Sequence, residues 1–298
     1  MQSITVVGSI NADLFVLVGR HPIPGETLIG RAGGVSAGGK GANQAVAAAL
    51  LGADVRMIGA VGDDTYADAA LEHLRCCGVD LAAVAVEKGA TGLAVITVSD
   101  DGENTIIVVP GANAAIDDVR VGENAAAIAA ADIVLVQGEI PASGFRAAVA
   151  AATGRVVVNL APVVPVNHDA LLAADPLVVN EHEARAVLEM FEATPGETEE
   201  DMAAALVSLG FTSAVVTRGA RGAVVADEAG VVAIEPVKVQ TVDSTGAGDA
   251  FVGALVARLA FGDELVAAAR FASRVGAFAA TRRGAQVSYP GAGDELPG

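Results

Sequence analysis

The sequence predicts an α/β protein with a doubly wound, mostly parallel β-sheet flanked by helices and a small β-sheet lid. Short runs rich in β-branched residues alternate with helical segments along most of the 298 residues, which is the pattern of parallel strands with crossover helices. Two other segments alternate apolar and polar residues around turn sequences, as hairpins do. A hydrophobic content of 53% allows a chain of this length to bury one large core.

The strands of the main sheet are expected in six short apolar runs. They are ITVVGSI at 4–10, VRMIGAVG at 55–62, DIVLVQGE at 132–139, RVVVNLAP at 155–162, DPLVVNEHE at 175–183 and SAVVTRGARG at 213–222. The segments between them predict crossover helices. In TEEDMAAALVSLG, for example, Thr198 is placed as an N-cap and Gly210 as a C-cap.

The lid is expected from two segments that are distant in the sequence. Residues 14–34 have turn chemistry at Pro24-Gly25, and residues 91–111 have it at Asp101-Gly102, so each predicts a hairpin. Two such hairpins can form one accessory sheet. We therefore expect a main α/β domain of residues 1–12, 38–90 and 111–298, with the lid formed by residues 13–37 and 91–110.

The composition favours small-molecule chemistry. A net charge of −18 and a pI near 4.4 would repel nucleic acid and anionic membrane surfaces, so neither is expected as a partner. The two cysteines, Cys76 and Cys77, are adjacent and offer neither a disulfide framework nor metal-ligand spacing. Since no apolar run approaches the length of a membrane span and no signal segment precedes ITVVGSI, a cytoplasmic protein is expected.

The glycine-rich stretch GGVSAGGKGANQ at 33–44 contains G-x-x-x-x-G-K from Gly34 to Lys40, as phosphate-binding P-loops do. A P-loop also needs Ser or Thr after the lysine and a buried strand before the loop. Here Gly41 follows Lys40 and LIGRAGGVS precedes the stretch, so both requirements fail. A flexible loop before an alanine-rich helix ending near Gly52 is the simpler interpretation. It leaves five glycines, a lysine and an asparagine unexplained.

Polar residues follow the predicted strands where each strand ends. In an open parallel sheet, ligands collect at the carboxyl ends of the strands. A single amide or carboxylate there is usually a helix cap or a solvated loop residue, but so many at one edge indicate a binding site. The residues are Asn11, Asp13, Glu139, Asn159, Asn180, Glu183 and Thr217.

The segment VDSTGAGDAFVGALVARLAFG carries the strongest chemical signal. Gly246, Ala247 and Gly248 lead into a long apolar helix, so unpaired backbone N–H groups converge at the positive end of its dipole and favour an anion. Asp249 follows them. An acidic residue there is ordinarily a capping device worth about 0.3–1 kcal/mol. Phosphoryl transfer needs both features, donors for the phosphoryl charge and a base that orients the attacking hydroxyl, so the pair favours a kinase.

These motifs resemble a known family. GGKGANQAVAA and DSTGAGDAF are similar to the two signatures of the ribokinase-like sugar kinases, also called the PfkB family, and the remaining motifs stand in the expected order, namely GSINAD, PGET, NEHEA, TRGARG and TRRGAQ. The similarity covers nearly the whole chain. GGKGANQ after SINAD resembles the branch of the family that acts on D-ribose. The resemblance therefore implies transfer of the γ-phosphate of ATP to the 5-hydroxyl of D-ribose, with Mg²⁺ and K⁺ as cofactors.

The resemblance also implies roles for individual residues. It assigns to the sugar Asn11, Asp13, Gly39, Lys40, Asn43, Glu139 and Asp249. It assigns to the nucleotide and its metal Asn180, Glu183, Thr217, Gly219, Gly222, Gly248 and Ser273. It assigns to a monovalent cation Asp243, Thr245, Ala279, Arg282, Gly284 and Ser288. Gly246, Ala247 and Gly248 become the anion hole and Asp249 the base. Asn180 and Glu183 also fit a helix N-cap with an acidic first turn, and both interpretations can be true.

The lid implies a homodimer, because so small a sheet is unstable alone and the family often pairs two lids, with Ala94 and Ile96 expected to face the sugar. Two alternatives stay open. A related kinase for another pentose, deoxyribose, a ketose or a nucleoside would keep Asp249 and the anion hole. A non-catalytic sugar sensor would keep the sugar contacts and lose the base or the anion hole.

Overall fold

A computed structural model of the protein describes residues 2–298 and contains one large sheet and one small sheet. The nine strands of the large sheet run in the spatial order β13-β12-β11-β10-β9-β8-β1-β4-β5. They are β1 (Ser3–Val7), β4 (Asp54–Gly62), β5 (Asp80–Glu87), β8 (Ile133–Gln137), β9 (Arg155–Asn159), β10 (Leu177–Asn180), β11 (Ala214–Thr217), β12 (Ala223–Asp227) and β13 (Gly230–Ile234). The predicted doubly wound α/β fold is confirmed.

Strand β1 lies where the order of the sheet reverses. It pairs in parallel with β4 on one side and with β8 on the other, so the chain builds outward from it in both directions. All pairs from β5 to β11 are parallel, and only β12 and β13 are antiparallel. The six predicted strands are present. The sequence analysis did not identify β5, β12 or β13, of which β5 and β13 form the two edges of the sheet and β12 lies next to an edge.

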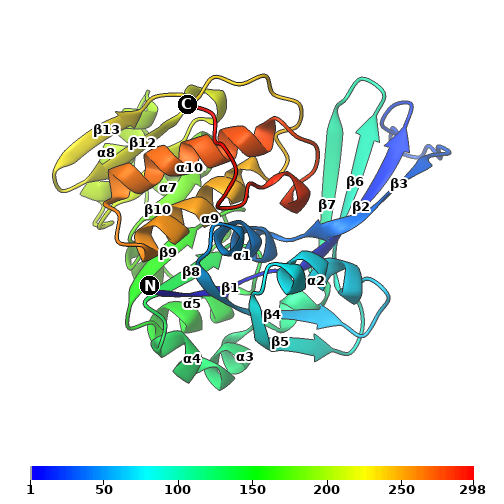
Figure 1. Ribbon diagram of the computed structural model, residues 1–298, viewed down its shortest axis with the longest axis horizontal. Helices are drawn as coiled ribbons and strands as arrows, with labels where there is room; N and C mark the ends of the chain where they lie inside the picture. Colours follow the sequence, from blue (N-terminus) through cyan, green and yellow to red (C-terminus); the bar gives the residue numbers. More distant parts are fainter. Residues whose placement is uncertain (1) are drawn as a thin grey trace.

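Helices cover both faces of the large sheet (Figure 1). They are α1 (Lys40–Leu50), α2 (Ala67–Cys76), α3 (Asp118–Glu123), α4 (Ala125–Ala129), α5 (Ala142–Ala151), α6 (His168–Leu172), α7 (Glu181–Met190), α8 (Glu199–Ser208), α9 (Ala247–Ala260) and α10 (Leu265–Ala280), with short 3₁₀ turns η1 (Gly111–Ala115), η2 (Gly219–Arg221) and η3 (Gln286–Ser288). Two cores result. One contains α1, α2, α9 and α10, and the other contains α3 to α8.

Alternation along the strands divides the apolar side chains between these cores. On β1, Ile4 and Val6 enter the first core and Val7 enters the second, as expected of a parallel sheet covered on both faces. Helix α8 begins at the predicted N-cap, Thr198, which forms a reciprocal capping box with Asp201. Gly253 of α9 lies so close to α1 that a Cβ atom there would be 2.5 Å from the carbonyl oxygen of Gln44. Glycine at this position therefore allows the two helices to pack in direct backbone contact.

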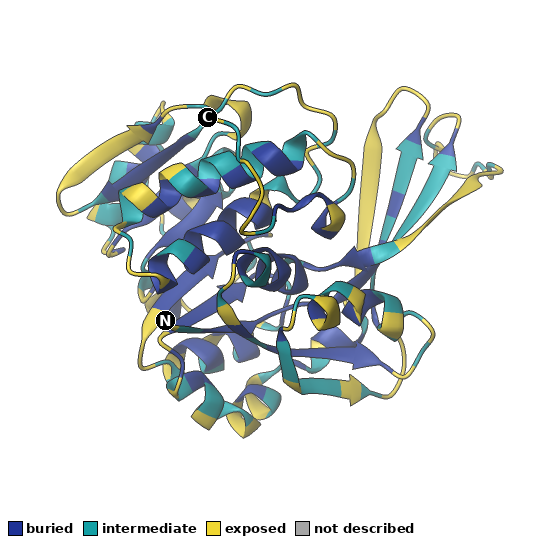
Figure 2. Cartoon of the chain, viewed as in Figure 1, coloured by how far each residue is buried: buried dark blue, intermediate teal, exposed yellow. Residues whose placement is uncertain are grey.

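The small sheet projects from one end of the molecule (Figure 1) and is much more exposed than the main body (Figure 2). Its order is β3-β2-β6-β7. The strands are β2 (Asn11–Val18), β3 (Arg31–Gly38), β6 (Gly92–Ser99) and β7 (Asn104–Val109). Two antiparallel pairs, β2-β3 and β6-β7, join through the parallel pair β2-β6. The expected union of two distant hairpins in one small sheet is confirmed.

Among residues 2–298, every helix is either too short or too polar to cross a lipid bilayer.

Candidate active site

A pocket of about 190 Å³ opens at the carboxyl edge of the large sheet, beside the amino ends of α1, α7 and α9. It brings together residues that the sequence analysis drew from four motifs, namely Lys40, Asn180, Glu183, Thr217, Gly246, Gly248 and Asp249. A larger hollow of about 780 Å³ lies at the opposite edge, among the amino ends of the strands, and its lining includes Arg155, Asp175 and Ser213. None of the predicted site residues lines that hollow.

Asp249 is the third residue of α9, and its side chain is buried. Its Oδ1 accepts a hydrogen bond from Nε2 of Gln44 at 2.8 Å, and its Oδ2 accepts from Nδ2 of Asn43 at 2.9 Å. The acidic residues at the same position of α7 and α8, Glu183 and Asp201, instead accept from the backbone N–H of their own N-cap residues. The carboxylate of Asp249 therefore points to α1 and does not cap its own helix.

The amino end of α9 presents unpaired backbone donors. Gly246 is its N-cap and has a φ of 71°, in the left-handed region that favours glycine. The N–H of Ala247 donates to the carbonyl oxygen of Ser244 at 3.1 Å. Across residues 2–298, no partner accepts from the N–H groups of Gly246, Gly248 or Asp249. Three unpaired donors at the positive end of a helix dipole form a binding site for an anion.

A chain of buried amides holds Asp249 in place. Nε2 of Gln44 donates to Asp249 and, at 2.8 Å, to Oδ1 of Asn159, while its Oε1 accepts from Nε2 of Gln137 at 2.8 Å. Oδ1 of Asn43 accepts from Nε2 of Gln286 at 2.8 Å. The sequence analysis did not single out Gln44, Gln137 or Gln286. The position of Gln44 beside Asn43 in GGKGANQ was the only available signal, and periodicity alone does not show which amides face inward.

Lys40 begins α1, and three carboxylates face its ammonium group. Asp249 contributes most to raising the pKa of Lys40, and Glu139 and Glu183 add to it, while burial acts in the opposite direction. The group therefore remains a cation. Oε2 of Glu139 accepts from the backbone N–H of Lys40 at 3.0 Å and from the hydroxyl of Ser9. Glu139 thus lies at the amino end of α1, where the helix dipole favours a negative charge.

Asn11 lies at the base of the lid. It was expected after the end of β1 and is instead the first residue of strand β2. Its Oδ1 accepts from Nδ2 of Asn113 at 2.7 Å. Gly39, just before α1, has a φ of 88°, and a Cβ atom there would be 2.7 Å from the backbone nitrogen of Asn11. The conformation and the close approach both require glycine, so this residue joins the lid to the start of α1.

Asp13, two residues further along β2, is buried and carries an unusual protonation equilibrium. Burial is the main cause and the carboxylates of Glu139 and Asp249 add to it, and together they raise the pKa of Asp13 to about 7. In the parallel register, Asp13 pairs with Ala94 on β6, and both Ala94 and Ile96 are buried. A carboxyl group that holds its proton to neutral pH therefore lies beside an apolar strip of the lid.

The side of the pocket formed by the start of α7 contains the motif Asn-x-x-Glu. Oδ1 of Asn180 accepts from the N–H of Glu183 at 2.8 Å, and Oε2 of Glu183 accepts from the N–H of Asn180 at 2.8 Å. The capping interpretation of this pair is confirmed. Burial raises the pKa of Glu183, while the hydrogen bond from Asn180 and the charge of Lys40 oppose that rise. Three predicted nucleotide-site residues lie outside the pocket, namely Gly219 and Gly222 beyond β11 and Ser273 on α10.

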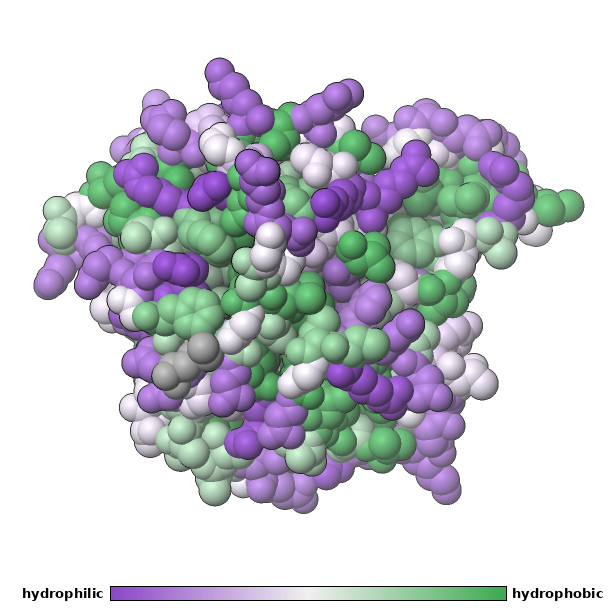
Figure 3. All heavy atoms as spheres, viewed as in Figure 1, coloured by the Kyte–Doolittle hydropathy of each residue, from purple (hydrophilic) through white to green (hydrophobic). Residues whose placement is uncertain are grey.

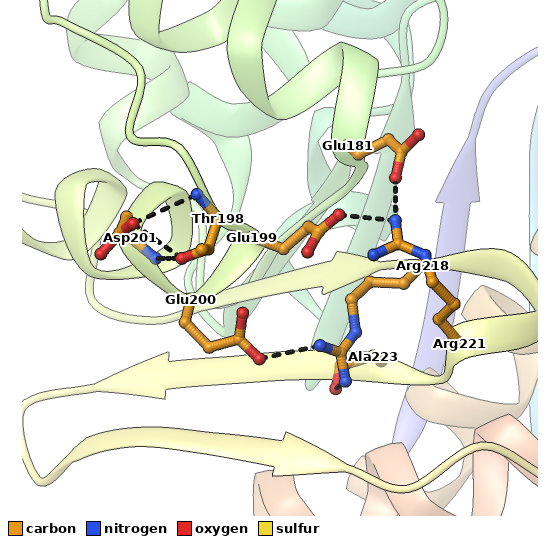
Figure 4. A network of polar contacts seen from close by, with 8 residues as sticks. All are labelled: Glu181, Thr198, Glu199, Glu200, Asp201, Arg218, Arg221 and Ala223. Carbon is orange, nitrogen blue, oxygen red and sulfur yellow. Dashed lines mark hydrogen bonds and ion pairs between the residues drawn. The ribbon is translucent and has the colours of Figure 1, made fainter.

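Two arginines fix the turn that follows β11 (Figure 4). Nη1 of Arg218 donates to Oε1 of Glu200 at 2.8 Å. Nη2 of Arg221 contacts the carboxylates of Glu181 and Glu199. These bonds tie the turn to the first turns of α7 and α8. The turn that carries Gly219 and Gly222 is therefore held at the amino ends of two helices.

Asp243 joins the loop before α9 to the loop after α10. Its Oδ1 accepts from N and Oγ1 of Thr245 at 2.9 and 2.7 Å, and its Oδ2 accepts from the N–H of Gly284 at 2.9 Å. Burial acts to raise the pKa of Asp243, but the hydrogen bonds from Gly284 and Thr245 together lower it, so the group is ionised at neutral pH. The junction therefore holds a fixed negative charge directly before the anion site.

The other residues predicted for a cation lie in the same region. The carbonyl oxygen of Ala279 accepts from the N–H of Arg282 at 3.1 Å, and the Arg282 guanidinium lies 3.8 Å from the ring centroid of Phe278. Ser288 is buried and its hydroxyl donates to the carbonyl oxygen of Ala285 at 2.7 Å. The guanidinium of Arg282 is thus occupied with an aromatic ring, and only backbone oxygen of this residue can serve a cation.

Comparisons with known proteins identify the family of this chain. The profile of the pfkB family of carbohydrate kinases matches residues 1–292. The chain is 37% identical to ribokinase of Schizosaccharomyces pombe, across 97% of this chain and 95% of that protein. A crystal structure of Thermotoga maritima ribokinase superposes with a TM-score of 0.91 at 32% identity, and the match covers 98% of this chain and 97% of that one.

The structure of Arabidopsis thaliana ribokinase complexed with ribose and ATP superposes with a TM-score of 0.89 at 32% identity, covering 98% of this chain and 96% of that one. The chain belongs to the pfkB family of carbohydrate kinases. It is therefore an ATP-dependent sugar kinase. The rejection of a P-loop at Gly34 to Lys40 agrees with the structure, whereas the flexible loop expected there is wrong, because β3 spans Arg31–Gly38. Gly38 ends a lid strand and α1 begins at Lys40, so no loop remains there to wrap phosphates as a P-loop does.

The buried carboxyl of Asp13 predicts a pH dependence of the stability of this kinase. The unfolded chain releases the proton near the ordinary pKa of 3.8, whereas the folded protein retains it to about pH 7. The folded state binds more protons in this interval, so its stability falls as pH rises from about 4 to 7. The full difference is at most about 4 kcal/mol. Asp13→Asn should therefore become more stable than the wild type above pH 7. Urea unfolding of both proteins at pH 5 and pH 8 measures this difference in stability.

Asp54→Asn, an exposed change at the amino end of β4, serves as the control and should shift stability equally at the two pH values. If Asp13→Asn also shows no difference between pH 5 and pH 8, the proton is not held in the folded protein.

Proposed function

We propose that this kinase transfers the γ-phosphate of ATP to the 5-hydroxyl of D-ribose and produces ribose 5-phosphate. The observation that carries the proposal is the carboxylate of Asp249, which two amides hold at the amino end of α9 beside unpaired backbone N–H groups. Phosphoryl transfer needs a group that orients the attacking hydroxyl and donors for the phosphoryl charge. The similarity to ribokinases supports D-ribose as the acceptor.

The sugar lies between the base of the lid and the amino end of α9. Carboxylates accept hydrogen bonds from sugar hydroxyls, while an ammonium group and amides donate to them. A matching sugar forms hydrogen bonds with these buried polar groups. An analogue that leaves one of them without a hydrogen bond binds more weakly, so the same groups reject it. The sugar ligands are Asn11, Asp13, Gly39, Lys40, Asn43, Glu139 and Asp249.

Asp249 orients the 5-hydroxyl and receives its proton. A carboxylate is a weak base for an alcohol, so the proton moves late, as the bond to phosphorus forms, and positioning matters more than basicity. The N–H groups of Gly246, Gly248 and Asp249 donate to the phosphoryl group. Ala247 adds a donor only by sharing the N–H that already bonds to Ser244.

The nucleotide lies along the opposite side of the pocket. Its ligands are Asn180, Glu183, Thr217, Gly219, Gly222, Gly248 and Ser273. Glu183 uses Oε2 in the capping box and keeps Oε1 for the pocket, which suits Mg²⁺ because this ion usually keeps several waters and takes only one or two carboxylates. Mg²⁺ bound with ATP supplies positive charge that offsets the charge of the phosphates.

A monovalent cation, K⁺, would be held at the junction of the two loops at Asp243. The ionised carboxylate and the surrounding backbone oxygens support this proposal, because bound ions often dominate the local electrostatics of a site. Its ligands come from Asp243, Thr245, Ala279, Arg282, Gly284 and Ser288. The cation would fix the loop that leads into Gly246, and through it the geometry of the anion hole.

The small sheet is the lid of the kinase and the interface of a homodimer. Its edge strand β7 exposes four apolar residues in succession, Ile106, Ile107, Val108 and Val109, and apolar side chains gather on the projecting sheet (Figure 3). An exposed apolar edge strand is unfavourable in a monomer and suits pairing with a second sheet. The division at residues 13–37 and 91–110 stays a prediction, as do the cytoplasmic location and the expected absence of nucleic-acid and membrane partners.

Other acceptors and a non-catalytic sensor are separated from this proposal by one assay. ATP consumption is measured with D-ribose, deoxyribose, other pentoses, ketoses and nucleosides at equal concentration. The proposal expects D-ribose to give the largest kcat/KM. A larger kcat/KM for another acceptor would make that compound the substrate of the same reaction. Sugar binding without consumption of ATP would identify a sensor.

The central prediction concerns Asp249→Asn. The variant loses the base and should lower the single-turnover rate by about 10²–10⁴ with both substrates saturating. One side-chain N–H then faces a donor of Asn43 or Gln44, so one hydrogen bond is lost and stability falls by about 1 kcal/mol. Asp201→Asn, at the same position of α8, is the control and should keep full activity. If Asp249→Asn folds and retains more than about a tenth of the wild-type rate, the mechanism is wrong.

Potassium should activate the enzyme. At matched ionic strength, K⁺ should raise kcat more than Na⁺ does, because the larger ion fits a site of backbone oxygens around Asp243. Asp243→Asn should abolish the difference between the two salts. Asp227→Asn, at the opposite edge of the sheet, should preserve it. Equal rates of the wild-type enzyme in the two salts would contradict the assignment.

The dimer is tested by light scattering at micromolar concentration. The wild-type protein should have twice the mass of the chain, and Ile107→Glu should produce monomers because it places a charge on the exposed edge strand β7. The matched control is Val231→Glu, which changes an exposed residue of the other edge strand, β13, and should leave the dimer intact. A monomeric wild type would refute the proposed interface.

A further inference from the structure

The hydroxyl of Tyr289 is a buried donor without a partner. The side chain is only 6% exposed, and within residues 2–298 no group forms a hydrogen bond with its oxygen. Its ring packs in the core formed with α1, α9 and α10. A buried hydroxyl that lacks a partner costs free energy, so its position requires an explanation.

The hydroxyl lies at the amino end of α9, on the side of the sugar carboxylates. A Cβ atom on Gly246, the N-cap, would be 2.6 Å from the Tyr289 oxygen. Burial, followed by the charges of Asp249 and Asp13, raises the pKa of Tyr289 well above its usual value. Asp249 comes from α9 and Asp13 from the lid strand β2, so the hydroxyl is within electrostatic reach of both walls of the sugar site.

The protonation state limits what this hydroxyl can do. Because it keeps its proton throughout the working pH range, it can donate a hydrogen bond but cannot act as a base. The nearby carboxylate of Asp249 accepts from Asn43 and Gln44 but forms no hydrogen bond with Tyr289. An oxygen of the bound ligand, near the start of α9, can supply the acceptor that this hydroxyl lacks.

We propose that the Tyr289 hydroxyl donates a hydrogen bond to the 5-oxygen of the sugar, which makes Tyr289 a specificity-determining residue of the site. The inference rests on the proposed function and specifies its acceptor. The 5-hydroxyl donates its proton to Asp249 and accepts from Tyr289 through one lone pair, which leaves the second lone pair to attack phosphorus. No proton leaves Tyr289. A sugar without the 5-hydroxyl leaves the tyrosine unpaired, as in the protein alone.

The test measures the affinity of the free protein for D-ribose and for 5-deoxyribose by calorimetry, in the wild type and in Tyr289→Phe. The variant removes one oxygen and retains the ring. It should bind D-ribose roughly tenfold more weakly, the usual effect of one hydrogen bond, and 5-deoxyribose as tightly as the wild type does. ADP affinity should be unchanged. The melting temperature should be equal or higher, because an unpaired buried hydroxyl is lost.

The chain's other tyrosine provides the control. Tyr66→Phe, at the N-cap of α2, should change none of the affinities. Equal D-ribose affinity in the wild type and Tyr289→Phe would overturn the inference, as would an equal loss for both sugars or a loss confined to ADP. A wild type that does not bind D-ribose would instead refute the proposed function, so the two failures are distinguishable.

Discussion

The structure of the site depends on the burial of one carboxylate, that of Asp249. A buried negative charge must be paired or hydrogen-bonded, and here two amides on consecutive residues of α1, Asn43 and Gln44, donate to its two oxygens. The dipole of α9 and the charge of Lys40 add to this stabilisation. Helices α1 and α9 must therefore stay in a fixed relation, which the direct backbone contact at Gly253 allows.

The same region gathers more negative than positive charge. Asp13 lies near Glu139 and Asp249, and Lys40 is an ammonium group that faces Glu139 and Asp249. Part of the imbalance is relieved because Asp13 retains a proton to about pH 7. A ligand rich in hydroxyl groups offers further donors to these carboxylates without adding charge. The electrostatics of the site thus suit a neutral polyol on one side and an anion at the amino end of α9 on the other.

Much of this could be predicted from local sequence. The alternation of β-branched runs and helices, the capping box at Thr198 and the two turn sequences of the lid each depend on neighbouring residues, so the sheet, the helices and the small sheet followed from them. Strands β12 and β13 were missed because each has only five residues, and an apolar run this short does not by itself distinguish a strand from part of a helix. The motifs GGKGANQ and GAGD also identified the candidate site, because glycine at close backbone approaches leaves a recognisable pattern.

Tertiary structure decided what those residues do for one another. Asp249 and Asp201 occupy the same position in their helices. Asp201 caps its own helix, whereas two amides of α1 hold the carboxylate of Asp249, because α1 packs beside the start of α9. Local sequence did not show the contacts of Gln44 and Tyr289, since their partners or neighbours lie far along the chain, at Asp249 and Gly246. The raised pKa of Asp13 likewise arises from burial and from charges on other elements. Local sequence determined which elements form, whereas the packing of distant elements determined the electrostatics, because both burial and charge proximity are properties of the assembled fold.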